Sequence, residues 1–339
     1  MTRAVLGSAL PILGALAISG LLLLAVGVDP LEYYGVVLHR GLLTPRGVQE
    51  TLTRMAPLML LAASLIVSFR AGLWNLGVDG QFLLAAVIVA AVCPLLDGVI
   101  GRAPALLVGA MLACVVGGAW ALLPAWLRAA HGVNEIITTL MMSFLGASFA
   151  NVLVKLAFGD PGSTVPQTRT LPVADRLPRL FGSTVHLGVP LAFLVLIATH
   201  LLVTRTAWGL RLRTLGASPR AARHVGIAVD RTIVVALVAS GALAGLAGGI
   251  DIMGVWGNVR ADWNPAYGLT VIPLVFLARL NGWAVAGFVL LFSVLSVGSE
   301  SASVRLGVPS YYSFVLVALV LLFLALADWL AQRRSARVT

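Results

Sequence analysis

The residues of this sequence that could carry out chemistry are few, and they are widely spaced. Its five histidines stand singly, and none lies near a cysteine or in the H-E-x-x-H spacing of a zinc site. The two cysteines, Cys93 and Cys114, lie inside apolar runs, where a cysteine is typically a small buried hydrophobe. The sequence contains neither a G-x-S-x-G nucleophile motif nor a G-x-G-x-x-G dinucleotide motif. We therefore expect a protein that is not an enzyme, with no metal and no cofactor on this chain.

A single lysine limits the nucleotide chemistry of the chain. Of the 23 basic residues, 22 are arginines and only Lys155 is a lysine. A Walker A loop needs the pattern G-x-x-x-x-G-K-[ST], whereas Lys155 lies in Val-Lys-Leu. We therefore expect no ATP hydrolysis by that route on this chain.

Polar residues interrupt the apolar sequence in three segments, and the first covers residues 69–81, FRAGLWNLGVDGQ. It follows an apolar run of about 15 residues, which as a helix is too short to cross a bilayer core of ~30 Å alone. Its glycines favour irregular backbone, which is tolerated at membrane depth only inside protein or beside a cavity. Arg70 and Asp79 would then face a pathway or a partner. A tight cytoplasmic turn with both charges in water explains the pattern equally well.

The second segment, residues 131–142, has the sequence HGVNEIITTLMM. Asn134 is suited to cap the helix that follows, and Glu135 in its first turn suits the positive end of the helix dipole. This structural role is the simpler interpretation. A position beside a transport pathway is the alternative for this segment.

The third segment, residues 205–231, is the longest and most basic internal loop and holds six arginines. Ser218 is suited to be an N-cap, Pro219 to be a first helical residue, and Gly226 to end a short helix. A short capped helix that exposes small residues is suited to docking another protein. The alternative is a basic loop that only fixes the orientation of the spans.

The composition requires a membrane around these segments. Of the 339 residues, 60% are hydrophobic and 11% are charged, against about 25% charged residues in soluble domains. Such a chain cannot cover a water-facing surface of its size, and its low polar content excludes disorder. In a membrane protein the net charge of +10 indicates arginines that orient the spans and contact anionic lipid. Nucleic acid is not the expected partner of these charges, since an aromatic content of 7% gives no stacking platform for bases. We expect a polytopic all-α membrane protein that contacts the lipid bilayer and binds no nucleic acid.

Ten apolar runs predict about ten transmembrane helices. The runs cover residues 5–28, 55–70, 81–100, 105–127, 135–157, 188–204, 232–254, 269–279, 283–300 and 309–330. We expect short or broken spans near residues 55–81 and 269–282. Gly241, Gly245 and Gly249 are spaced four residues apart, which favours a close contact with another helix. Residues 159–187 contain four prolines and predict an external loop without a long helix.

The charges place both chain ends on the cytoplasmic side. An even number of spans puts both chain ends on the same side of the membrane. If that side is the cytoplasm, the cytoplasmic segments carry 13 basic residues and the external segments carry 10. The arginines of residues 205–231 decide this orientation. We expect one transmembrane domain, residues 1–339, made of a first span with an interfacial segment (1–54), two core parts (55–204 and 232–330), the cytoplasmic loop (205–231) and a cytoplasmic tail (331–339).

In these segments the sequence resembles the permease subunits of bacterial ABC importers, in the branch that serves nucleosides and simple sugars. Residues 72–81, GLWNLGVDGQ, resemble the family pattern G-L-F-N-I-G-V-E-G-Q, with Trp74 in place of Phe and Asp79 in place of Glu. Residues 132–137, GVNEII, resemble G-V-N-E-V-I. Residues 206–227 resemble the loop T-x-x-G-x-x-L-R-A-V-G-x-N-P-x-A-A-x-x-x-G-I, and residues 268–282 resemble a later segment less closely. The likeness runs in matching order through residues 55–330.

The resemblance implies partners that the residues themselves do not indicate. Such permeases pair with a second permease subunit, usually as a heterodimer in this branch, bind cytoplasmic ATPase subunits and receive substrate from an extracytoplasmic lipoprotein. ATP hydrolysis is then expected on the separate ATPase, and residues 216–227 are expected to be the coupling helix. The residues expected to couple to the ATPase are Gly209, Arg211, Gly216, Pro219, Ala221, Ala222, Gly226 and Ile227. The candidates for the translocation path are Trp74, Asn75, Asp79, Gln81, Asn134 and Glu135.

The function expected from this resemblance is import of a nucleoside or a simple sugar by ATP-driven alternating access across the bacterial cytoplasmic membrane. A branched-chain amino acid permease of the same class is the alternative, and Asn75, Asp79 and Glu135 do not discriminate between these substrates. An ion-coupled secondary transporter is the alternative from a different class, and it predicts uptake that needs no ATPase.

Overall fold

The computed structural model describes residues 2–309 and 312–335, and the regular elements in this part of the chain are helices. Extended pairing is limited there to three isolated bridges, which join residues 159–186 among themselves and to Arg260. The predicted all-α class is confirmed for these residues.

Seven helices among the described residues are long and apolar enough to cross a membrane. They are α3 (Pro45–Arg70), α4 (Val78–Ile100), α5 (Arg102–His131), α6 with its π-helical end (Glu135–Ala157), α7 (Gly188–Arg205), α10 with its π-helical end (Val229–Trp256) and α12 (Gly282–Leu306). The multi-pass fold is confirmed, whereas the count of about ten spans is not. The other three predicted runs contain shorter apolar stretches: Leu13–Ala25, Tyr267–Leu277 and Phe314–Ala327.

The other helices of residues 2–152, 188–251 and 267–335 are not among these seven candidate spans. They are α1 (Thr2–Ala25), α2 (Pro30–Leu38) with the π-helix His39–Leu43, α8 (Ala207–Ala217), α9 (Pro219–His224), α11 (Tyr267–Leu277) and α13 (Tyr312–Ser335). The predicted short span near residues 269–282 corresponds to α11, which has 11 residues.

The expectation that residues 55–70 form a short span is wrong. The helix begins at Pro45, a residue that suits the first turn, and its 26 residues are long enough to cross a bilayer. The polar side chains at its start, such as Gln49 and Glu50, continue the helix without continuing the apolar run. The predicted break that follows is confirmed, because residues 71–77 are not helical.

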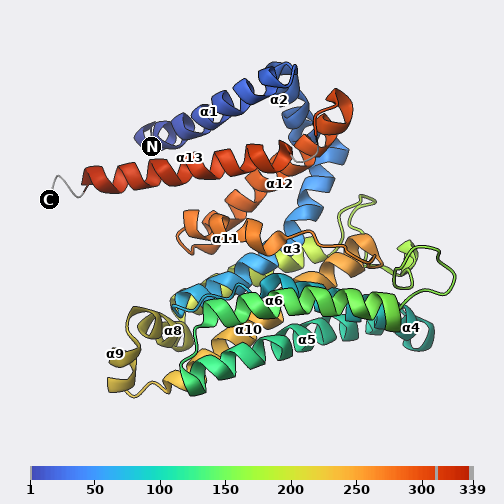
Figure 1. Cartoon of the computed structure of the whole chain (residues 1–339), viewed down its shortest axis with the longest axis vertical. Helices are drawn as coiled ribbons and strands as arrows, with labels where there is room; N and C mark the ends of the chain where they lie inside the picture. The colour runs from blue at the N-terminus through green and yellow to red at the C-terminus, as the bar shows by residue number, and fades with distance from the viewer. Residues whose placement is uncertain (1, 310–311, 336–339) are drawn as a thin grey trace. The chain divides into compact units, whose positions relative to one another are not determined.

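The chain divides into two compact units, residues 1–54 with 287–339, and residues 55–286. In the first unit α1 runs along α13 (Figure 1). The rings of Tyr33 and Tyr312 meet edge to face with centroids 5.3 Å apart, and the hydroxyl groups of Tyr312 and Ser19 are hydrogen-bonded. The expected boundaries of a single transmembrane domain stay a prediction.

The second unit is built on close packing among α4, α5 and α10, which lie side by side (Figure 1). A Cβ atom on Gly245 would lie 2.1 Å from the carbonyl oxygen of Ala113, and one on Gly241 would lie 2.5 Å from that of Gly117. Glycine is required at both positions because the backbones of α5 and α10 touch there. The predicted close contact of the α10 glycines is confirmed.

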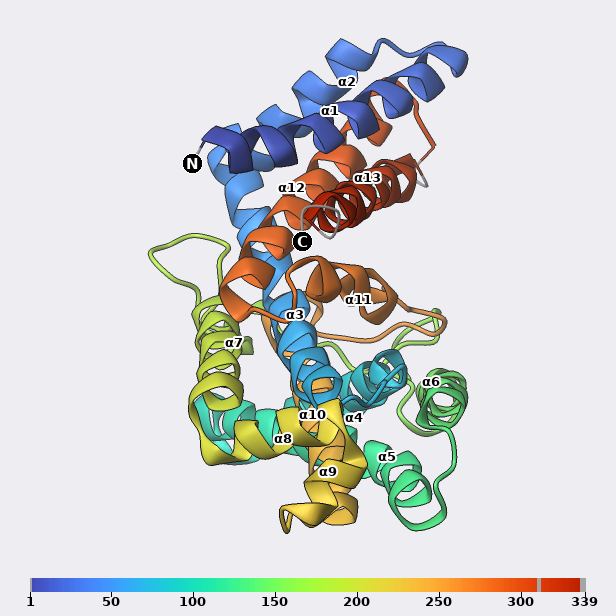
Figure 2. The same cartoon turned by 90° about the vertical axis from the view of Figure 1, so that its left-hand side faces the viewer.

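The second unit has two distinct ends along α7. Figure 2 shows α8 and α9 at one end, and the loop that precedes α7 at the other end. This loop, residues 158–187, contains only the short 3-10 helix Val173–Asp175, as its prolines predict. The loop is held to the chain after α10 by backbone hydrogen bonds, including Thr168 N to Val259 O (2.9 Å) and Leu171 N to Gly257 O (2.8 Å). We call this end the loop end.

His186 is a structural residue of the loop end. It is 1% exposed, and its Nδ1 accepts a hydrogen bond from the backbone N of Gly188 at 3.1 Å. Burial, with the charge of Arg179 nearby, lowers the pKa of His186 to about 4, so the ring is neutral near pH 7.

Candidate functional site

The break after α3, residues 71–77, lies against Gly216, the first residue of the predicted coupling helix (residues 216–227). Gly72 takes a left-handed φ of +70°, and the backbone N of Leu73 donates to Ser68 O at 3.0 Å, which ends α3. A Cβ atom on Gly72 would lie 2.9 Å from the Cα atom of Gly216, and one on Gly216 would lie 2.5 Å from the carbonyl oxygen of Arg70. The structure therefore brings two predicted segments into direct backbone contact, at positions where only glycine fits.

Asn75 and Gln81 hold the break in place from inside the protein. Both side chains are fully buried, and the Asn75 amide donates to Gln81 Oε1 at 3.0 Å and to Ser240 Oγ on α10 at 2.9 Å. The amide oxygen of Asn75 also accepts from the backbone N of Gly77 at 3.1 Å. Buried polar groups that are fully hydrogen-bonded in this way specify one backbone arrangement. These two candidates for the path are therefore seen in a structural role.

Asp79 joins the first turn of α4 to the first turn of α11. Its Oδ1 accepts a hydrogen bond from the backbone N of Gly268 at 2.7 Å. A Cβ atom on Gly268 would lie 2.8 Å from the carboxyl carbon of Asp79, so no side chain fits there. The carboxylate thus lies at the N-terminal ends of both helices and joins them.

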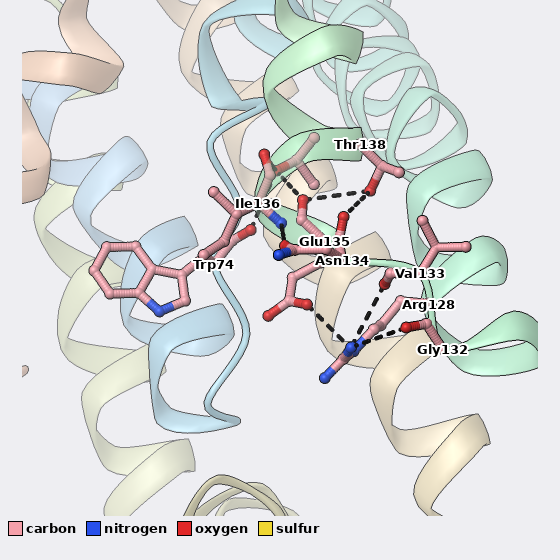
Figure 3. Close-up of polar contacts among 9 residues, drawn as sticks. Trp74, Arg128, Gly132, Val133, Asn134, Glu135, Ile136 and Thr138 are labelled. Atoms are coloured by element: carbon pink, nitrogen blue, oxygen red, sulfur yellow. Dashed lines mark hydrogen bonds and ion pairs between the residues drawn. The ribbon is translucent and has the colours of Figure 1, made fainter.

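The segment around Glu135 is bound to the same break from the other side. Glu135 is 6% exposed, and its Oε2 lies 3.2 Å from Nε of Arg128, the ion pair drawn in Figure 3. Asn134 caps α6 as predicted, because its Oδ1 accepts from the backbone N of Ile136 at 2.9 Å. The hydroxyl of Thr139, one turn further, accepts from the backbone N of Leu76 at 3.1 Å.

Trp74 differs from the other candidates because its side chain is not enclosed. It is 38% exposed, and its indole points away from the Arg128–Glu135 pair (Figure 3). The ring contacts Phe69 at 5.1 Å and Phe276 of α11 at 5.2 Å, and those two rings stack on each other at 4.8 Å. We call Phe69, Trp74 and Phe276 the first ring cluster. It lies at the C-terminal end of α11, near the contact of Gly72 with Gly216.

The segment predicted to couple to the ATPase, residues 205–231, contains two helices, α8 and α9. Thr206 caps α8 by accepting from the backbone N of Gly209 at 3.2 Å, and Ser218 caps α9 by accepting from that of Ala221 at 3.2 Å. The predicted short helix after Ser218 is confirmed, with Pro219 as its first residue. Helix α8 was not predicted, although Thr206 before a helix-compatible run is a cap signal.

The predicted coupling residues divide by burial into two groups. The buried ones, which hold the segment to the rest of the unit, are Gly209 and Ala222. The exposed ones are Arg211, Gly216, Pro219, Ala221 and Gly226. Two large apolar side chains next to them in the sequence, Leu210 and Val225, are exposed as well. Ile227 is intermediate. An exposed surface of arginines, small residues and two large apolar side chains is suited to contact with another protein.

Some residues of the site carried no assigned role in the sequence. Gly268 lies in a segment of family likeness, but its contact with Asp79 depends on the fold. Ser240 and Ser143 are polar residues inside apolar runs, and this pattern could have marked them as partners of buried polar groups. Ser143 Oγ accepts a hydrogen bond from the backbone N of Gly80 at 3.1 Å. Within the described ranges no three His, Cys, Asp or Glu side chains are grouped to hold a metal ion.

Comparison with known proteins gives the wider family. The model of the family "Branched-chain amino acid transport system / permease component" matches residues 47–325. The chain is 34% identical to the glucose ABC transporter permease protein TsgB13 of Haloferax volcanii, over 96% of this chain and 88% of the relative. It is 28% identical to the nucleoside ABC transporter permease protein NupB of Lactococcus lactis, over 96% and 91%. It is 27% identical to the guanosine ABC transporter permease protein NupP of Bacillus subtilis, over 82% and 80%.

Proposed function

The chain belongs to the family of permease components of branched-chain amino acid transport systems, in its sugar and nucleoside branch, and we propose that it imports a nucleoside or a simple sugar by ATP-driven alternating access. The matched relatives are permease components of ABC transporters and not enzymes. The proposal includes a separate ATPase, a second permease subunit and a substrate-binding lipoprotein as partners in the bacterial cytoplasmic membrane.

The relatives favour this substrate class over the two alternatives. The family description by itself would favour a branched-chain amino acid, but the matched relatives are glucose, nucleoside and guanosine permeases. An ion-coupled secondary transporter would have no need of a protein-docking segment such as α8–α9.

The observation that carries the proposal is the backbone contact between Gly72 and Gly216. A force applied to α8 by an ATPase reaches the break between α3 and α4 directly, because no side chain separates the two backbones. The break bears Trp74, whose ring contacts Phe276 on α11. We infer that closure of the ATPase pair moves the first ring cluster and so opens or closes the cytoplasmic end of the path.

The exposed faces of α8 and α9 are the proposed ATPase contact. Leu210 is 57% exposed and Val225 is 69% exposed, which is unfavourable in water and favourable in an interface. Ala221 beside them is exposed, whereas Ala222 is buried. A substitution at Ala221 therefore tests docking to the ATPase, and a substitution at Gly216 tests whether movement of the ATPase reaches the break after α3.

Two substitutions separate these roles. Ala221→Glu is expected to abolish co-purification with the ATPase, because a charged side chain enters the docking surface. Gly216→Val is expected to keep co-purification and to reduce uptake, because its side chain would overlap the Arg70 carbonyl and push the two backbones apart. Pull-down of the tagged complex and uptake of labelled substrate are the measurements.

Ala174→Glu is the matched control, since Ala174 is an exposed alanine at the loop end. It should leave ATPase binding at the level of the unmodified protein. Retention of the ATPase by Ala221→Glu, together with normal uptake by Gly216→Val, would show that α8–α9 is not the coupling segment. Uptake that persists without the ATPase would favour the secondary transporter.

A further inference from the structure

A second group of aromatic side chains lies at the opposite end of α11 from the first ring cluster. Phe82 of α4 contacts Trp263 with ring centroids 5.9 Å apart and Tyr267 at 5.7 Å, and Trp256 contacts Trp263 at 5.8 Å. We call these four residues the second ring cluster. They come from three separate parts of the chain: α4, the end of α10, and the segment that leads into α11.

The second ring cluster is partly open. Phe82 is 1% exposed and forms its floor, whereas Trp256 is 45% exposed and Trp263 and Tyr267 are half-buried. Partly exposed aromatic side chains beside a buried one offer ring surface on which flat or ring-shaped ligands can stack.

The segment that carries Trp263 is held firmly. The backbone N of Asp262 donates to Asn151 Oδ1 at 2.7 Å, and the Asp262 carboxylate lies 3.3 Å from Nζ of Lys155. Asp262 and Ala266 both take left-handed φ values, +62° and +51°, which non-glycine residues rarely adopt. Backbone strain of this kind persists where the surroundings fix it, as they do at many functional sites.

The second ring cluster adjoins the polar junction of α4 and α11. Tyr267 directly precedes Gly268, whose backbone N donates to Asp79, and Phe82 lies three residues after Asp79. The second ring cluster therefore adjoins the point where the Asp79 carboxylate joins α4 to α11. At the other end of the 11-residue α11, Phe276 belongs to the first ring cluster.

We propose that the second ring cluster binds the ring of the transported sugar or nucleoside as it enters, with Trp263 and Trp256 as residues that determine specificity. The inference rests on the proposed function and adds to it the site and the mode of binding. A sugar presents its C–H face to an indole, and a nucleoside presents its base. The two ring clusters then lie before and after the Asp79–Gly268 junction along one short helix.

The test uses the complete complex with its lipoprotein and ATPase, reconstituted in liposomes, and two labelled probes, D-glucose and guanosine. Trp263→Ala and Trp256→Ala are expected to lower uptake of the transported probe about tenfold each, the range expected for loss of one stacked ring. Basal ATP hydrolysis should stay at the level of the unmodified complex. Trp263→Phe should restore most of the uptake and should change the ratio of guanosine to glucose transported.

Trp283→Ala is the matched control. Trp283 is also an exposed tryptophan, at 56%, but its ring contacts Phe193 of α7 and not the second ring cluster. Its replacement should leave uptake and the substrate ratio unchanged.

The outcomes separate the inference from the proposed function. An unmodified complex that takes up neither probe contradicts the proposed function, and the inference with it. An unmodified complex that transports normally, together with Trp→Ala variants of equal rate and equal substrate ratio, overturns the inference alone. Equal loss of uptake in Trp263→Ala and Trp263→Phe would also overturn it, because stacking is retained by phenylalanine whereas a purely structural contact of the indole is not.

Discussion

Single residues of one motif have different roles because their burial differs. Asn75 and Trp74 are neighbours in the break after α3, yet the Asn75 side chain is fully buried and hydrogen-bonded, whereas Trp74 is 38% exposed and its ring contacts the other rings of the first ring cluster. Asp79 lies between these extremes, with its carboxylate used by the backbone of α11. Sequence neighbours in this motif therefore divide into residues that fix the backbone and residues that face the proposed path.

We predict that Asn75→Ala lowers the stability of the permease by about 1–3 kcal/mol. The substitution leaves Gln81 Oε1 and Ser240 Oγ without the Asn75 amide, and unsatisfied buried polar groups cost about that much. The measurement is thermal unfolding in detergent of proteins that carry Cys114→Ala, followed with a maleimide dye that becomes fluorescent when the buried Cys93 is exposed.

Trp74→Ala serves as the comparison, because its ring is partly exposed and its loss leaves no polar group unsatisfied. It should change the unfolding midpoint less than Asn75→Ala does. It should still reduce uptake, although the protein stays folded. Equal midpoints for Asn75→Ala and the unmodified protein would show that the Asn75 network does not hold the break.

At the scale of elements, close backbone contact explains both where the helices pack and where they break. Helices α5 and α10 touch through glycines, since within lipid there is little hydrophobic driving force and tight packing of small residues replaces it. The same kind of contact recurs between the break after α3 and α8, at Gly72 and Gly216. In the first case the contact is between two long spans, and in the second it joins a span to the segment formed by α8 and α9.

Gly245→Ala is predicted to destabilise the second unit, whereas Gly118→Ala is predicted to be tolerated. A Cβ atom on Gly245 would lie 2.1 Å from a backbone oxygen of α5, but one on Gly118 would lie 3.4 Å from its nearest neighbour on α10. Overpacking of the first kind costs about 1–3 kcal/mol, while the second gains helix propensity. The same dye assay compares the two midpoints, and equal shifts would argue against the tight α5–α10 contact.

For the whole molecule, orientation in the membrane decides which end of the second unit meets which partner. Helices α8 and α9 lie at one end of α7, and the loop before α7 lies at the other (Figure 2). The arginines of residues 205–231 predict that the α8–α9 end is cytoplasmic. The loop end is then outside, where a lipoprotein would deliver its substrate to the second ring cluster.

We predict that a single cysteine at Ala174 reacts with a membrane-impermeant maleimide in intact cells, and that one at Arg211 reacts only after permeabilisation. Both positions are exposed, so accessibility from each side of the membrane is the variable tested. Cys93 and Cys114 are replaced by alanine in both proteins. The reverse labelling pattern would contradict the orientation and the assignment of α8–α9 to the ATPase.

Many local features of this fold could be predicted from the sequence, because the formation of membrane helices depends on local composition. The apolar runs, the glycine spacing in α10 and the caps at Asn134 and Ser218 each act within one helix or one helix face, so pattern alone predicted them. The length of α3 was missed, because a helix continues through polar residues such as Gln49 that end an apolar run.

Only the tertiary structure decided which of the polar segments meet. The contacts of Gly72 with Gly216, of Asp79 with Gly268 and of Asn75 with Ser240 join residues far apart in the chain, and no local pattern encodes such distances. The two ring clusters likewise exist only where α11, a helix of 11 residues, brings aromatic side chains from separate elements to its two ends. Scarce charge determined that the chain lies in a membrane, and long-range backbone contact decided how its few polar segments are assembled into one site.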